Sequence, residues 1–131
     1  MTLEPVTLSG QYVDLVPLTQ QHHDQLAHAV TDGELWSLWY TPIPEPGEMA
    51  AEIDRRLSLQ KAGTMLPFAV IDKATQQAVG MTTHMNIDLH GPRVEIGSTW
   101  YAQRVQRTPL NTEAKLLLLS HAFDRLGCLA V

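Results

Sequence analysis

The chain has 131 residues, and 14 acidic against 9 basic side chains give it a formal net charge of -5. Hydrophobic residues make up 44% of the chain, which suffices for a folded core and excludes global disorder. The length fits one domain, residues 1–131, and the acidic balance argues against nonspecific binding of nucleic acid. No apolar run reaches the length of a membrane span, and the single cysteine, Cys128, fits a reducing cytoplasm as a small buried residue.

The first elements are predicted from hydrophobic periodicity and helix-capping residues. Residues 11–16 alternate at period two, which predicts a strand that Pro17 ends. Thr19 can cap a helix that runs to about Val30, with Leu26, Ala29 and Val30 on its apolar side.

An aromatic segment rich in proline, residues 34–47, follows this helix. Pro42, Pro44 and Pro46 stiffen the segment and forbid a continuous helix, so it is a candidate wall of a ligand pocket. Trp39 and Tyr40 are its candidate functional residues, and packing of these aromatics into the core is an equally open alternative.

A second helix and a hairpin come next. Residues 46–62 place Met49, Ile53 and Leu57 at helical spacing. The β-rich runs 66–71 and 78–89, separated by the polar turn 72–77, predict two paired strands.

The most informative stretch is a strand, a basic polar loop and a helix in that order. Residues 94–101 are β-branched and aromatic, residues 103–112 form the loop, and 113–126 are strong helix formers followed by Gly127. A helix start that follows a strand presents free N–H groups and a positive dipole end, which suit a phosphate. A polar loop that binds nothing is the alternative, because the glycines usual in phosphate loops are missing.

Three motifs in this stretch resemble the coenzyme A signature of the GNAT superfamily of N-acetyltransferases, in the branch of the ribosomal-protein acetyltransferases RimJ and RimL. The motifs are residues 95–101 (EIGSTWY), residues 106–108 (QRT) and residues 111–115 (NTEAK). Arg107 and Pro109 stand where this family commonly has glycine. The resemblance extends from about Thr7 to Val131.

The resemblance implies an α+β fold with a mixed, mostly antiparallel sheet flanked by helices. It also implies acetyl-CoA as co-substrate, held by the backbone of the strand and by the loop that follows it. The cofactor-binding residues that it implies are Ser98, Thr99, Trp100, Tyr101, Val105, Gln106, Arg107, Thr108, Asn111 and Thr112.

Two residues are candidate bases for taking the proton from an amine. Glu95 lies on the strand where several members of the family have a catalytic carboxylate, and a solvated or salt-bridged carboxylate is the alternative. His84, on the neighbouring strand, has a side chain that ordinarily titrates near neutral pH, and a structural histidine is the alternative. No metal site is predicted, because His22, His23 and His28 lack the spacing that puts two ligands on one helical face.

The resemblance covers only the first part of the family's domain. Residues 127–131 predict the start of a fifth strand, so we expect a domain truncated there, with an open sheet edge that could pair with a second copy. The predicted function is acetyl transfer from acetyl-CoA to a primary amine, on a protein N-terminus or a small molecule, in the cytoplasm. The alternatives are a truncated, non-catalytic, self-associating α+β module and, last, a nucleotide-phosphate binder of another fold.

Overall fold

A computed structural model of the chain describes residues 4–35, 43–88, 93–125 and 128. Its strands are β1 (Leu8–Ser9), β2 (Val13–Pro17), β3 (Leu66–Asp72), β4 (Gln77–Asp88) and β5 (Arg93–Tyr101). Its α-helices are α1 (His23–Thr31), α2 (Met49–Lys61) and α3 (Pro109–Ser120), and a π-helical turn, His121–Arg125, continues α3. Trp39 and Tyr40 lie outside the described residues. Of residues 127–131, where the sequence predicts a further strand, the structure describes only Cys128.

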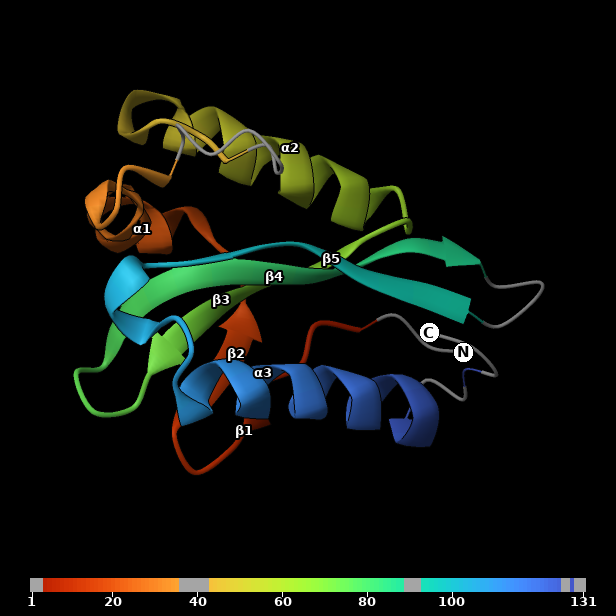
Figure 1. Cartoon of the computed structure of the whole chain (residues 1–131). Coiled ribbons are helices and arrows are strands. Elements are labelled where there is room, and N and C mark those ends of the chain that lie inside the picture. The colour runs from red at the N-terminus through yellow and green to blue at the C-terminus, as the bar shows by residue number, and fades with distance from the viewer. Residues whose placement is uncertain (1–3, 36–42, 89–92, 126–127, 129–131) are drawn as a thin grey trace.

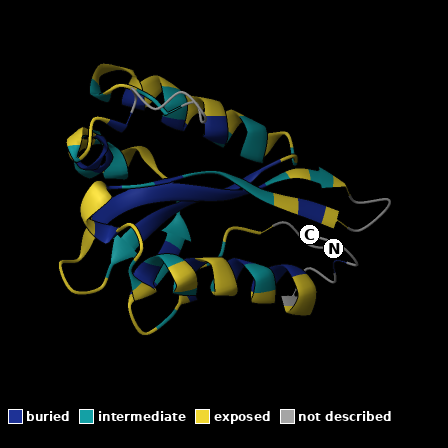
Figure 2. Ribbon diagram, in the orientation of Figure 1, coloured by how far each residue is buried: buried dark blue, intermediate teal, exposed yellow. Residues whose placement is uncertain are grey.

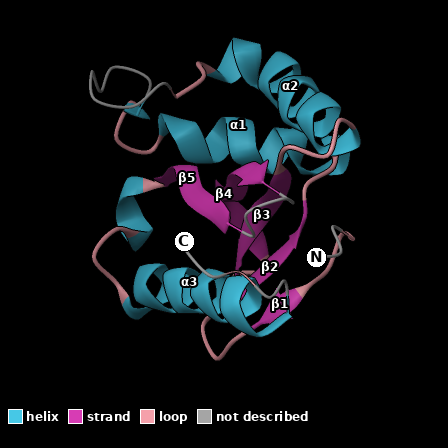
Figure 3. Ribbon diagram, turned by 90° about the vertical axis from the view of Figure 1, so that its right-hand side faces the viewer, coloured by secondary structure: helices cyan, strands magenta, loops and turns pink. Residues whose placement is uncertain are grey.

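The five strands form one sheet in the order β1-β2-β3-β4-β5, and every pair of neighbours is antiparallel. Helices α1 and α2 cover one face of this sheet and α3 lies on the other (Figure 1). The strands at the centre are buried between these layers, and a view turned by 90° shows the same arrangement (Figures 2 and 3). The predicted α+β fold with a mostly antiparallel sheet flanked by helices is confirmed, and among the described strands no parallel pair occurs.

The sequence patterns of the first two helices hold in the structure. Thr19 and His22 form a capping box ahead of α1, and Leu26, Ala29 and Val30 are buried as predicted. In α2 the buried apolar residues are Met49 and Ile53. Arg56 is buried with them, at 1% exposure, which the apolar pattern did not indicate.

Helix α3 differs from the prediction at its start and in its burial. It begins at Pro109 rather than Glu113, because proline is well suited to the first turn of a helix. The sequence is apolar nearly all round from Leu116 to Leu126, which predicts a helix buried against the sheet. This prediction is wrong in part, since Leu116 is 57% exposed and Phe123, in the π-helical turn, 47%. Only a stripe at helical spacing meets the sheet, formed by Leu110, Ala114 and Leu118.

Glu113 ties α3 to the turn between β1 and β2. Its carboxylate accepts hydrogen bonds from the backbone N–H groups of Gln11, Tyr12 and Val13, at 2.7–3.0 Å. Burial acts to raise the pKa of Glu113, but these hydrogen bonds hold it below the ordinary value. A Cβ atom on Gly10 would overlap the Glu113 carboxylate, so a larger residue there would displace this side chain from its hydrogen bonds to the turn.

A β-bulge interrupts β5 where it pairs with β4. Met81 faces Trp100 and Thr83 faces Gly97, so Thr82 alone lies opposite both Ser98 and Thr99. Ser98 adopts a left-handed backbone conformation with φ 48°. Because glycine favours that region and serine does not, the bulge is a strained position in an otherwise regular strand.

Candidate active site

A cavity of about 350 Å³ lies between β5 and α3, beside the bulge. Ile96, Gly97, Ser98, Thr99 and Tyr101 all line it, although successive residues of a strand point to opposite faces. The bulge at Ser98 breaks this alternation, and residues of both faces can also border a cavity that follows the edge of a strand. In the described part of the sheet β5 is the outer strand, so the cavity runs along a strand edge that no described strand pairs.

Helix α3 supplies the polar groups on the other side of this cavity. Asn111 and Lys115, one turn apart on the helix, line it. The Thr82 and Thr99 hydroxyl groups, 2.7 Å apart, hydrogen-bond across the bulge in its wall. The cavity therefore offers amide, hydroxyl and ammonium groups along a strand edge, which suits an elongated ligand rich in amides. Lys115 was not predicted, although its spacing of four residues from Asn111 is a signal that could have identified it.

The predicted cofactor residues fall into two groups. Ser98, Thr99, Tyr101 and Asn111 come together around the cavity. The others do not line it: the side chains of Trp100 and Val105 are buried in the core, whereas Gln106, Arg107 and Thr112 are exposed and Thr108 lies at the start of α3.

The loop before α3 uses several of its own hydrogen-bond donors to fix its shape. Gln106 donates its side-chain amide to the Tyr101 carbonyl oxygen at 3.0 Å, and the Thr108 hydroxyl donates to the Val105 carbonyl oxygen at 2.6 Å. The Thr108 side chain makes no capping bond to α3. These two side chains therefore order the loop.

Arg107 occupies a position that suits glycine. Its φ is 59°, in the left-handed region, and its side chain is exposed. Arginine and glycine thus support the same local fold here, but arginine does so under strain and adds a positive charge beside the start of α3.

A second cavity, of about 620 Å³, lies between α2 and β5 on the opposite face of the sheet. Ser98 lines this cavity as well, together with Ile43, Glu48, Glu52, Arg55 and Arg56. The Ser98 hydroxyl points to this face and donates to the Met85 sulfur at 3.6 Å. The bulge residue is therefore common to both cavities.

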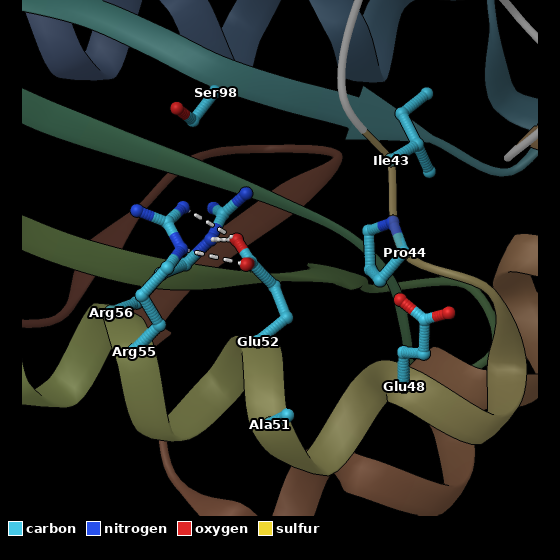
Figure 4. A pocket seen from close by; sticks show the side chains of 8 residues that line it. All are labelled: Ile43, Pro44, Glu48, Ala51, Glu52, Arg55, Arg56 and Ser98. Carbon is cyan, nitrogen blue, oxygen red and sulfur yellow. Dashed lines mark hydrogen bonds and ion pairs between the residues drawn. The ribbon is translucent and has the colours of Figure 1, made fainter.

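Glu52 binds two arginines at the floor of the second cavity (Figure 4). Arg55 donates Nε and Nη2 to the two carboxylate oxygens at 2.8 Å each, and Arg56 donates Nε to Oε2 at 2.7 Å. Burial acts to raise the pKa of Glu52, but the two arginines hold it below the ordinary value. Burial lowers the pKa of Arg56, against the opposing effect of Glu52, yet a guanidinium group keeps its charge in proteins.

The candidate base Glu95 is exposed on β5, and its Oε2 accepts a hydrogen bond from the Asn86 side-chain amide at 2.9 Å. Glu95 faces Met85 across the strands, so both side chains lie on the same face of the sheet. Because Met85 also contacts the Ser98 hydroxyl, Glu95 lies on the face that carries the second cavity.

The second candidate base, His84, is fully buried on the α3 face. Its Nε2 lies 3.1 Å from Nδ1 of His121, and the two rings stack with centroids 5.2 Å apart. Burial, and to a lesser extent the charge of His121, lowers the pKa of His84 to about 4. A neutral buried imidazole in this position packs against α3, so of the two candidates Glu95 is better placed to meet a substrate.

Tyr101, at the end of β5, is a phenol that stays neutral at physiological pH. Burial raises its pKa to about 12. Tyr101 therefore contributes an uncharged side chain to the lining of the first cavity.

The acetyltransferase (GNAT) domain model matches residues 13–131. This chain belongs to the GNAT acetyltransferase family. A GCN5-related N-acetyltransferase from Brucella melitensis has a similar structure with a TM-score of 0.79 and 34% identity, over 95% of this chain and 57% of that one. This GNAT chain thus spans less than two thirds of the length of the Brucella protein.

Two further structures share the fold of the GNAT chain. A probable acetyltransferase of the GNAT family from Chromobacterium violaceum has a TM-score of 0.76 and 24% identity, over 92% of this chain and 61% of that one. The ribosomal L7/L12 alpha-N-protein acetyltransferase RimL, solved in complex with coenzyme A, has a TM-score of 0.75 and 16% identity, over 92% and 69%. No curated protein matches the sequence.

Neither a metal-binding cluster nor a membrane-spanning helix is found among the described residues. Among them, no group of three or more His, Cys, Asp or Glu side chains is placed to bind a metal ion. No helix within these ranges has the length and hydropathy needed to cross a membrane.

Proposed function

We propose that this chain binds acetyl-CoA in the first cavity and transfers the acetyl group to a primary amine bound in the second cavity. The observation that carries the proposal is the position of Ser98, at a bulge that lines both cavities. A thioester that lies along the edge of β5 and an amine on the α2 face would meet at this residue. The family membership of residues 13–131 supports the same chemistry.

In this reaction the amine nitrogen attacks the thioester carbonyl carbon, a C–N bond forms, the C–S bond breaks and coenzyme A leaves as a thiolate. The thiolate takes up one proton, which balances the proton that the amine loses. The outer edge of β5 would pair with the amides of the pantetheine arm, and Asn111 and Lys115 would bind it from α3. Arg107 and the first turn of α3 would bind the pyrophosphate. Glu95 would take the proton from the amine, directly or through water.

The first test is calorimetric titration of acetyl-CoA into the chain and into two variants, Arg107→Ala and Arg107→Gly. If the arginine contributes its charge, we expect both variants to bind about tenfold more weakly, as for the loss of one charged contact. If the left-handed backbone matters more, Arg107→Gly will bind at least as tightly as the parent chain. A folded chain that binds no acetyl-CoA would contradict the proposal and favour the non-catalytic, self-associating alternative.

The role of Glu95 is tested by Glu95→Gln, which keeps an acceptor for Asn86 but cannot take a proton. We expect kcat to fall about 100-fold, at the lower end for loss of a general base, because water can partly replace it. Affinity for acetyl-CoA should not change, and Glu4→Gln, which neutralises another exposed carboxylate, should keep the parent rate. A Glu95→Gln rate within a few-fold of the parent would remove Glu95 from the mechanism.

A further inference from the structure

The second cavity contains a buried arginine whose hydrogen bonds are incomplete. Arg56 is 1% exposed, and its Nη1 has no hydrogen-bond partner among the residues that the structure describes. A buried guanidinium group normally has each of its donors satisfied, because an unpaired buried donor costs about 1–3 kcal/mol. Arg56 therefore has a donor that no described residue uses, in a side chain that lines the cavity.

The charge around Arg56 is also incompletely balanced. Arg55 and Arg56 share one carboxylate, that of Glu52, so the three side chains together carry a net positive charge. Figure 4 shows both guanidinium groups extending from α2 toward the strand that carries Ser98. Glu48, the other acidic residue of the cavity, precedes the first residue of α2, lies away from the guanidinium groups, and is exposed.

From these observations we infer that the second cavity recognises an anionic group of the acceptor, and that this group is a carboxylate close to the amine. A carboxylate matches the planar donor pattern of guanidinium groups and would complete the hydrogen bonds of Arg56. The inference rests on the proposed function. It narrows the acceptor to amines that bear a carboxylate near the nitrogen, since the arginines and Ser98, where transfer is proposed, line one cavity.

The test uses pairs of ligands that differ only in the carboxylate. Each free α-amino acid of a panel is compared with its carboxamide, and ¹⁵N NMR of the Arg56 Nε–H reports binding without any need for turnover. We expect the carboxylate member to bind about tenfold or more tightly than the amide, as for loss of one charged hydrogen bond. Equal binding of the two members, or no perturbation of Arg56 by any ligand, would overturn the inference.

Variants separate the proposed contact from general effects of charge. Arg55→Met removes one of the two arginines. Because Arg55 is exposed, the substitution leaves the core packing intact, and it should abolish the preference for the carboxylate. Lys61→Met removes an exposed positive charge from the same helix and should keep the preference. A preference that survives in Arg55→Met, or one that disappears in Lys61→Met, would contradict the assigned contact.

A second arm distinguishes two sources of the carboxylate. Peptides with amidated C-termini and an N-terminal Asp or Glu carry the carboxylate on a side chain, whereas free amino acids carry it beside the amine. A response to free amino acids supports the inference for a small molecule, and a response to these peptides alone supports it for a peptide N-terminus. If the arginines instead act on the reacting carbonyl oxygen, Arg55→Met will slow all amines equally, which overturns the inference.

Failure of the inference can be told apart from failure of the proposed function. Saturable binding of acetyl-CoA without a preference for carboxylates would overturn the inference alone. Perturbation of Arg56 by carboxylates in a chain that binds no acetyl-CoA would support the anion site and contradict the acetyl transfer.

Discussion

Replacing Glu52 with Gln is expected to lower the free energy of unfolding by about 3 kcal/mol or more, because it leaves a buried charge without its counter-ion. Arg56 is 1% exposed, and its only hydrogen bond and only ion pair among the described residues are to Glu52. A glutamine can still accept one hydrogen bond, but it cannot offset the positive charge. Urea denaturation of the two proteins at neutral pH measures the effect.

Replacing the other member of this ion pair, Arg56, should cost less stability. Arg56→Met removes the buried charge and keeps an apolar stem of similar length, so we expect a smaller loss of stability than for Glu52→Gln. Glu48→Gln is the matched control, because Glu48 is an exposed carboxylate of the same helix end, and it should change the free energy of unfolding by less than about 0.5 kcal/mol. A loss for Arg56→Met as large as that for Glu52→Gln would show that packing of the arginine stem matters more than its charge.

The second large effect is a loss of stability in mild acid that originates at His84. The pKa of His84 in the folded chain is about 4, below the ordinary 6.5, because the ring is buried and faces His121. The unfolded chain therefore binds a proton near pH 6.5 that the folded chain does not accept until about pH 4. The stability that the neutral ring provides is fully present above pH 6.5 and falls as the pH drops toward 4.

The size of this effect follows from the shift in pKa. Between pH 7.5 and pH 5 we expect His84 to account for a loss of about 2 kcal/mol, rising to about 3 kcal/mol below pH 4. Urea denaturation at pH 7.5 and pH 5 measures it. This window stays above the range in which the carboxylates Glu52 and Glu113, whose pKa values are lowered, are protonated.

Two variants assign the acid effect to its residue. His84→Gln cannot titrate, so most of the difference between the two pH values should disappear in this variant. A smaller loss of stability in acid should remain in this variant, because burial also lowers the pKa of His22. His28→Gln, on the exposed side of α1, should keep the full difference. A His84→Gln variant that loses as much stability in acid as the parent would contradict the assignment.

The local patterns of the sequence were enough to predict the elements and the class of fold. The capping box at Thr19, the period of Leu26, Ala29 and Val30, and the alternation in the strands all act over a few residues, so they can be read directly. The motifs of residues 95–101 and 111–115 likewise indicated the family that residues 13–131 match. The prediction of α3 was wrong in two respects. The helix begins one turn earlier, at Pro109, and the described residues leave part of its apolar surface exposed.

The sequence by itself determined the family, the antiparallel α+β architecture and the strand and helix that border the first cavity. Only the tertiary structure decided that Ser98 belongs to two cavities and that His84 is buried against His121. It also decided that Arg56 is buried beside Glu52, with an Nη1 that no described residue pairs. The physical reason is that each of these facts depends on contacts between elements or on the register of β4 against β5. Burial and contacts of this kind change the pKa of a side chain and the hydrogen bonds it needs, but they leave no sign in the residues next to it in the sequence.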